Sequence, residues 1–348
     1  MELLIDTNVL YYLSGISVNN KINIINLEDE LSNYELSISK WTLVEIIANN
    51  EMSILQKETI LKYIADKKIK VIPIIGITVF DIMPLNLADI INSPHKFKII
   101  NSIIEGKKKC EIEFMACYIK SFICIFSMAL FYQMEAKGEK DKNIFMFLTQ
   151  SFIMSNNDFI ISKTKEIINN FYLNNEESIF KSEIDGFIFT LLYANIVIFI
   201  GVKHGYLHEV FPDVEIVTLE SGESELSDNI LSSKIAKELL QKLGGEDIKN
   251  IVNKLGATNI RKSMSDYITV IGSQMPKGVC KFILAVVEKM LSEKMKITKN
   301  DIIDALLLDY YPQIQLFTFD SRFQKIIKIF DKQYYNFIIT LQNKCKKI

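Results

Sequence analysis

The chain opens with MELLIDTNVL, residues 1–10, and this stretch decides how the rest of the sequence is interpreted. Its apolar residues up to Ile5 are typical of a short buried strand, and the residues from Thr7 onward have the spacing of a helix that ends near Ser14-Gly15. Asp6 therefore stands where a buried strand passes directly into a helix.

The same alternation continues through the first quarter of the chain. The pattern predicts a strand at Leu36–Ser39, a helix at Trp41–Asn49, a second helix at Ile54–Ala65 and a β-rich run at Lys68–Ile75. Residues 16–34 are mixed and polar and receive no assignment. Strands that alternate with helices favour a parallel sheet with crossover helices, which is an α/β fold.

The α/β pattern returns at the other end of the chain. Asn300–Asp309 has helical spacing, Gln315–Phe319 is typical of a strand, Ser321–Phe330 is again helical, and Tyr335–Thr340 indicates a last strand. We therefore expect one parallel sheet formed by both termini.

The middle of the chain, from about residue 78, has long helical segments and few turn signals. We expect a mostly α-helical insertion at residues 91–289, between an N-terminal half-domain at 1–90 and a C-terminal half-domain at 290–348. The expected elements are helices at 97–105, 108–135, 143–155, 158–172, 180–201, 230–243, 246–254 and 278–294, with a polar loop at 220–225.

Composition places the protein among globular chains, because 49% of its 348 residues are apolar and 24% are charged. The net charge of −2 gives no overall basic field, so any nucleic-acid contact must come from a local patch. Only Arg261 and Arg322 are arginines, which favours point-charge lysine contacts to phosphate over bidentate arginine contacts.

Two features bear on location. The five cysteines form no CxxC pair and no signal peptide precedes the chain, so we expect a reducing, cytoplasmic setting. Residues 186–202 are uncharged and just long enough to span a membrane, but Asn195 near their centre favours a buried helix. A membrane-associated protein is the alternative.

Four short acidic stretches predict a binding site. Asp6 and Asp320 each follow a strand, and the carboxyl ends of parallel strands meet at one sheet edge. Asp301 and Asp304 share a helix face because they are three residues apart. With Glu45, these carboxylates would form a pocket for a hard divalent cation such as Mg²⁺ or Mn²⁺.

Each acid also has a purely structural interpretation. Asp6 and Asp320 precede helices, where aspartate is a favoured N-cap, and residues 298–301 have a capping-box-like pattern around Asp301. Glu45 alone fits a solvated helix position. Only the joint occurrence of all these acids favours the cation site.

That joint order resembles the PIN domain family of metal-dependent nucleases. The residues that carry the resemblance are LIDTNVL at 4–10, Glu45 in the next helix, NDIIDAL at 300–306 and FTFDSRF at 317–323. The resemblance covers roughly residues 1–90 and 290–340, and the helical middle lies outside it. It implies a PIN-like parallel sheet with an acidic pocket for one or two Mg²⁺ or Mn²⁺ ions.

The resemblance also implies roles for single residues. Asp6 would be a primary metal ligand, with Glu45, Asp301 and Asp320 completing the pocket and Asp304 replacing or supplementing Asp301. Two further residues, Asn8 and Thr318, would orient the ligands.

The implied activity is hydrolysis of RNA phosphodiester bonds by metal-activated water, as in toxins, defence nucleases or RNA-processing enzymes. Single-stranded DNA is an alternative substrate, because this chemistry does not need the 2′-hydroxyl. A non-catalytic PIN-like interaction module is the alternative function. For the enzyme and for the module alike, we expect the helical insertion to contact a protein regulator or a second copy of the chain.

Overall fold

The computed structural model describes residues 1–17, 22–72, 92–174, 176–204, 255–270, 272–293 and 297–346. By internal packing the chain forms two compact units, one of Met1–Glu111 with Ser273–Ile348 and one of Ile112–Gly272. The first unit therefore joins both ends of the chain. The predicted domain limits after residues 90 and 289 stay predictions.

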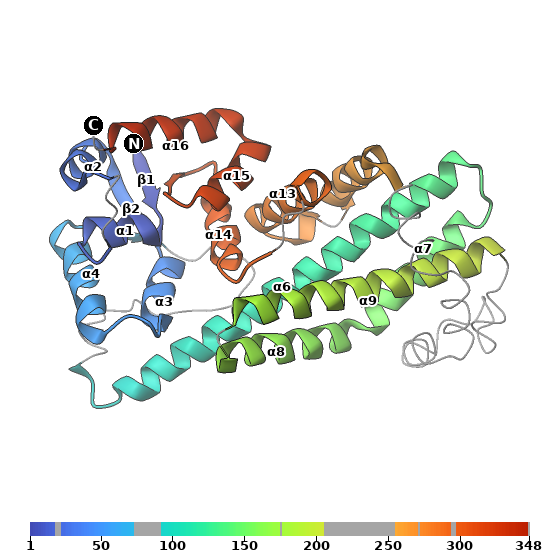
Figure 1. Ribbon diagram of the computed structural model, residues 1–348, viewed down its shortest axis with the longest axis horizontal. Helices are drawn as coiled ribbons and strands as arrows, with labels where there is room; N and C mark the ends of the chain where they lie inside the picture. Colours follow the sequence, from blue (N-terminus) through green and yellow to red (C-terminus); the bar gives the residue numbers. More distant parts are fainter. Residues whose placement is uncertain are drawn as a thin grey trace. The chain divides into compact units, whose positions relative to one another are not determined.

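The first unit contains a four-stranded parallel sheet in the order β3-β2-β1-β4 (Figure 1). Leu3 of β1 (Glu2–Ile5) pairs with Leu36 of β2 (Glu35–Ser39), and Leu4 pairs with Leu316 of β4 (Gln315–Phe317). On the outer side β2 pairs with β3 (Lys70–Ile72). An α/β fold whose parallel sheet draws on both termini is thus confirmed.

The apolar runs form strands because both faces of the sheet are covered. Leu3, Leu4 and Ile5 are fully buried although successive side chains point to opposite faces. The helices of this unit labelled in Figure 1 are α1 (Thr7–Leu13), α2 (Ile24–Leu31), α3 (Lys40–Ala48), α4 (Ile54–Asp66), α13 (Lys277–Glu293), α14 (Asp301–Leu307), α15 (Ser321–Phe330) and α16 (Lys332–Lys344).

Side-chain caps fix where several of these helices begin. Asn23 caps the previously unassigned helix α2, and Ser53 forms a capping box with Gln56 at the start of α4. A short 3-10 turn, η2 (Leu308–Tyr310), follows α14 within the predicted helix at 300–309.

The predicted last strand at Tyr335–Thr340 is wrong, because these residues belong to helix α16. The side chain of Asp331 accepts a hydrogen bond from Tyr334 N at 2.8 Å and starts the helix. Tyr334, Ile338 and Leu341 then lie buried at helical spacing. Tertiary packing outweighs the strand preference of the aromatic and β-branched residues here.

The described part of the second unit is helical. Helix α6 (Lys96–Ala136) begins in the first unit and is continuous, so the break predicted between residues 105 and 108 is absent. It is followed by α7 (Lys142–Ser155), α8 (Asn157–Asn174), α9 (Glu177–His204) and a helix at residues 255–270. The helices predicted at 230–243 and 246–254 and the loop at 220–225 lie outside the described residues.

Three buried polar side chains inside this unit are hydrogen-bonded to one another. Asn195 of α9 accepts a hydrogen bond from Thr149 Oγ1 at 2.9 Å and donates to Ser127 Oγ. All three residues are buried, so their hydrogen bonds offset the cost of removing them from water.

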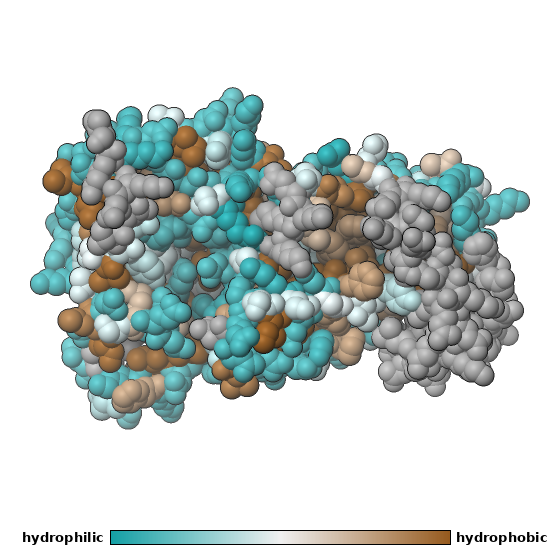
Figure 2. All heavy atoms as spheres, in the orientation of Figure 1, coloured by the Kyte–Doolittle hydropathy of each residue, from teal (hydrophilic) through white to brown (hydrophobic). Residues whose placement is uncertain are grey.

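Two of the described helices are long and apolar enough to cross a membrane, α6 and residues 177–203 of α9. The most apolar window of each is 72% and 67% buried within the protein, as in core helices of soluble proteins. Ile25 and Leu55 are examples of exposed apolar side chains. The face in Figure 2 mixes hydrophilic and hydrophobic residues.

Candidate functional site

Asp6 lies at the carboxyl end of β1 and is the N-cap of α1. It is 5% exposed, and its Oδ1 accepts a hydrogen bond from Thr7 N at 2.6 Å. Its Oδ2 accepts from Asn8 Nδ2 and from Thr318 Oγ1, each at 2.7 Å. The orienting contacts expected of Asn8 and Thr318 are therefore present in the structure.

Asn8 and Thr318 also join the ends of β1 and β4. Asn8 Oδ1 accepts from Phe319 N at 3.1 Å, and Thr318 Oγ1 accepts from Asp320 N at 2.9 Å. Residues more than 300 positions apart in the sequence are thus held together, by one hydrogen bond from backbone to side chain and one between side chains.

Asp320 follows β4 and caps α15 through one oxygen. Its Oδ1 accepts from Arg322 N at 2.7 Å and from Phe323 N at 2.9 Å. Within the described residues, no hydrogen bond reaches its Oδ2. The structural interpretation as an N-cap is correct for Asp320, yet it leaves half of the carboxylate available.

Glu45 projects from α3 and accepts a hydrogen bond from the Thr7 hydroxyl. Burial raises the pKa of Glu45, while the Thr7 hydrogen bond and the positive charges of Lys107 and Lys299 oppose the increase. The negative charge of Glu111 adds to it. Glu45 is therefore not a solvated helix residue.

Asp304, on α14, is 8% exposed. Burial raises its pKa well above the usual value, and the negative charges of Asp6, Asp320, Asp301 and Glu45 raise it further, in that order. Burial, the charge of Glu45 and, more weakly, that of Asp320 also raise the pKa of Asp6 to about 7. No hydrogen bond from a described residue reaches the Asp304 carboxylate. Asp304 is thus the residue on which the repulsion among these acids is concentrated.

Asp301, one turn earlier on α14, has a different environment. Its carboxylate is completely buried and is bound by the Arg322 guanidinium, through Nε at 2.6 Å and Nη2 at 2.5 Å. Its Oδ2 also accepts from Thr298 N at 2.5 Å, although the N-cap of α14 is Asn300 and it makes no side-chain cap. Asp301 is therefore neutralised by a cation of the chain itself.

The structure brings all five predicted acids into one electrostatic cluster, but not within ligating distance of a common point. In the described part of the chain, no three Asp, Glu, His or Cys side chains are close enough to hold a metal ion as they stand. The oxygens of Asp6 and one oxygen of Asp320 point toward hydrogen-bond donors instead.

Three residues near the cluster escaped sequence reasoning. Arg322 gives no local signal, because its partner Asp301 lies 21 residues earlier. Lys107 and Glu111 form a buried ion pair with 2.9 Å between Lys107 Nζ and Glu111 Oε1. Their spacing of four residues on one helix permits such a pair, but only the fold brings it near Glu45.

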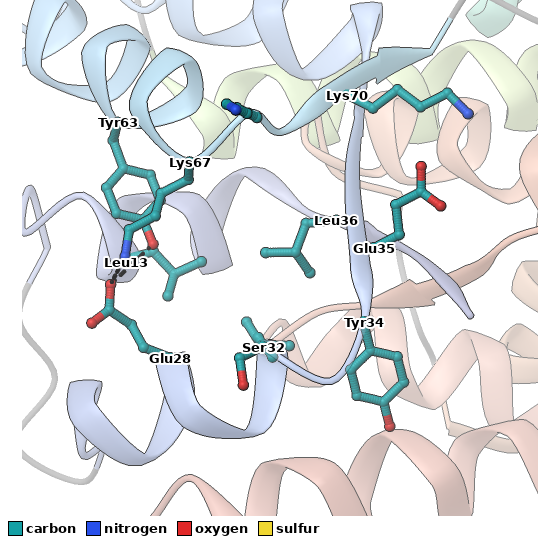
Figure 3. A pocket seen from close by; sticks show the side chains of 11 residues that line it. Leu13, Glu28, Ser32, Tyr34, Glu35, Leu36, Tyr63, Lys67 and Lys70 are labelled. Atoms are coloured by element: carbon teal, nitrogen blue, oxygen red, sulfur yellow. Dashed lines mark hydrogen bonds and ion pairs between the residues drawn. The ribbon is translucent and has the colours of Figure 1, made fainter.

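A cavity lies at the opposite, amino end of the sheet. This cavity of about 300 Å³ is lined by residues that include Glu35 and Leu36 of β2 and Lys70 of β3. Figure 3 shows Lys67 and Tyr63 both directed at Glu28 on one wall, at 3.2 Å from its Oε1. Glu28 is thus paired with a cation inside this cavity, whose lining also holds Glu35, Lys68 and Lys70.

The carboxyl end of the sheet thus holds a buried cluster of acids, where burial and mutual repulsion favour protonation or cation binding. The possible metal ligands there are carboxylate, amide and hydroxyl oxygens, which hard divalent cations prefer. In comparisons with known proteins, no family model matches the chain, and no curated protein or solved structure is similar enough to match it.

Proposed function

We propose that the protein is a PIN-like, Mg²⁺- or Mn²⁺-dependent nuclease that hydrolyses phosphodiester bonds of RNA. The observation that carries the proposal is the accumulation of Asp6, Asp304, Asp320 and Glu45 at the carboxyl end of a parallel sheet. Burial of several carboxylates with raised pKa is costly for a purely structural purpose, and such groups are typical of functional sites.

The residues present fit a hard cation by their chemistry. Asp6, Asp304, Asp320 and Glu45 would hold it, since Asp301 is bound to Arg322. The cation would have to draw these side chains closer together, because no three of them among the described residues are at ligating distance. When bound, it supplies Lewis-acid activation of water and neutralises charge that develops on the phosphate.

The residues of the chain itself position the acids and handle the proton. Asn8 and Thr318 fix the orientation of Asp6, and Thr7 holds Glu45. Asp304 accepts no hydrogen bond from a described residue, and its raised pKa suits it to take a proton from water. The choice of RNA rests on the resemblance of the four acidic segments to PIN nucleases, and single-stranded DNA is the alternative substrate.

A non-catalytic PIN-like module is the second candidate. Asp6 and Asp320 each cap a helix, and the acids of the described residues do not converge at ligating distance. A set of acids that only cap helices has no reason to bind Mn²⁺. Metal binding therefore separates the two candidates.

The experiment measures Mn²⁺ binding by calorimetry and cleavage of a labelled single-stranded RNA and the matched DNA. Wild type is compared with Asp6→Asn and with Lys67→Gln, a control that removes a charge at the amino end of the sheet. We expect Mn²⁺-dependent cleavage of RNA that Asp6→Asn abolishes and Lys67→Gln leaves unchanged. Cleavage of DNA alone corrects the substrate. Wild type that neither cuts nor binds Mn²⁺ overturns the proposal in favour of the non-catalytic module.

A further inference from the structure

Arg322 lies on α15 and contacts two of the acids, Asp301 at the start of α14 and Asp320 before α15. Its side chain reaches from the second residue of α15 to Asp301, the first residue of α14, with Nε–Oδ1 and Nη2–Oδ2 distances of 2.6 and 2.5 Å. Its backbone N–H donates to Asp320 Oδ1 at 2.7 Å. One residue is therefore bound at once to α14 and to the N-cap of α15.

The contact to Asp301 has the planar, two-point form that arginine makes with a carboxylate. Asp301 is completely buried, and the Arg322 side chain is 31% exposed. With Thr298 N also donating to Oδ2, both oxygens of Asp301 are occupied. Rotation of α14 about its axis would break all three bonds together.

Asp304 follows one turn after Asp301 on the same helix and lies on the same side of it. A fixed Asp301 therefore fixes the direction in which Asp304 projects. The charges that act on Asp304 come from Asp6, Asp320 and Glu45 as well as from Asp301, so this direction is toward the acidic cluster.

We propose that Arg322 is a positioning residue that binds Asp301 and Asp320 together, so that α14 presents Asp304 rather than Asp301 to the cation site. This role rests on the proposed function. Asp301 is then not a metal ligand but the anchor of the helix that carries one. Partners that orient a ligand in this way typically change metal affinity by about 10- to 100-fold when they are lost.

The test uses the full chain and Mn²⁺ itself as the probe. Calorimetry gives the Mn²⁺ affinity of wild type, Arg322→Gln, Asp301→Asn and the double variant, well below the melting temperature of each. We expect each single change to weaken binding about 10- to 100-fold. The double variant should be no weaker than the worse single variant, because the two changes remove the same contact.

The two possible roles of Asp301 predict opposite results for Arg322→Gln. If Arg322 positions the helix, the substitution weakens Mn²⁺ binding. If Asp301 is itself a metal ligand, removing the guanidinium frees its carboxylate, and Mn²⁺ binds as tightly as in wild type or more tightly. The second result overturns the proposal.

Two control variants on α15 separate positioning from general destabilisation. Lys325→Gln removes an exposed positive charge from the same helix, and Ile326→Val removes a methyl group from a fully buried side chain. Ile326→Val should lower the melting temperature, and neither change should alter the Mn²⁺ affinity. Equal losses of affinity in Ile326→Val and Arg322→Gln overturn the positioning role.

If Arg322→Gln does not fold, Arg322→Lys decides instead, because lysine keeps the charge but makes a single-point contact. We then expect a smaller but measurable loss of affinity, and an unchanged affinity overturns the proposal.

The Mn²⁺ affinity of Asp6→Asn is measured alongside. If wild type binds Mn²⁺, Asp6→Asn does not and the Arg322 variants bind normally, only the positioning role fails. Wild type without Mn²⁺ binding removes the proposed function and this role with it.

Discussion

The two ends of the same parallel sheet differ in how their charged side chains are paired. At the amino end, Lys67 pairs with Glu28 and Lys70 pairs with Glu2, at 3.2 and 3.4 Å. At the carboxyl end, Asp6 and Asp304 are buried beside other acids, and their pKa values rise as a result. Balanced, partly exposed pairs stabilise a fold slightly, whereas surplus buried charge of one sign indicates a site for a ligand of the opposite sign.

Among variants that test this difference between the two ends of the sheet, Asp304→Asn should have the largest effect. We expect this change to reduce Mn²⁺-dependent cleavage by more than about 100-fold, beyond the usual loss for a partner outside the metal ligands. The measurement is the initial rate on single-stranded RNA at saturating Mn²⁺. Activity within tenfold of wild type would show that the surplus charge of Asp304 is not used in the reaction.

Proton competition gives the next largest effect. A cation needs the ionised form of Asp6, whose pKa of about 7 means that it holds a proton at lower pH. We expect Mn²⁺ affinity to fall at least roughly tenfold for each pH unit below about 7, with at least the proton of Asp6 released on binding. Calorimetry in buffers of different ionisation enthalpy counts that proton, and an affinity that does not change below pH 7 contradicts the assignment.

The surplus charge should also weaken the metal-free fold. The unfolded chain ionises Asp6 above about pH 3.8, while the folded protein keeps the proton up to about pH 7. Stability from this group is therefore complete below pH 3.8 and is lost as the pH rises toward 7, by at most about 4 kcal/mol.

Asp304→Asn should remove a similar penalty, because burial and its neighbours also raise the pKa of Asp304. We expect the EDTA-treated variant to melt above wild type at pH 8, with a smaller difference at pH 5. Melting curves followed by circular dichroism measure both. A variant that melts below wild type at pH 8 contradicts the repulsion inferred here.

The smallest effects are expected at the amino end. Lys67→Ala and Glu28→Gln each break a partly exposed pair, so each should change the free energy of unfolding by less than about 1 kcal/mol. Neither should alter Mn²⁺ affinity. A tenfold loss of affinity in either variant would remove the distinction between the two ends of the sheet.

Sequence reasoning predicted the elements whose pattern is local. The strands that precede Asp6 and Asp320 are short apolar runs buried on both faces, so the sequence pattern alone placed the two acids at one edge of the sheet. Helix α16 was mistaken for a strand because Tyr335–Thr340 is rich in aromatic and β-branched residues, although Asp331 is a recognisable cap.

The different environments of Asp301 and Asp304 were beyond a sequence pattern. Both lie on the same face of α14, and their spacing alone cannot rank them. The distinction comes from Arg322, which reaches Asp301 only after α14 and α15 have packed within the folded unit. Contacts between distant segments depend on the tertiary fold, and no local signal records them.

The hydrogen bond between Asp6 and Thr318 has a consequence for synthesis of the chain. A ribosome that adds about 5–20 residues per second needs tens of seconds to make the residues between them. During that time β1 lacks β4, and the acidic cluster lacks Asp301, Asp304 and Asp320. The acidic cluster therefore assembles only near the end of translation, and a chain truncated before Thr318 lacks both Asp320 and the hydroxyl that orients Asp6.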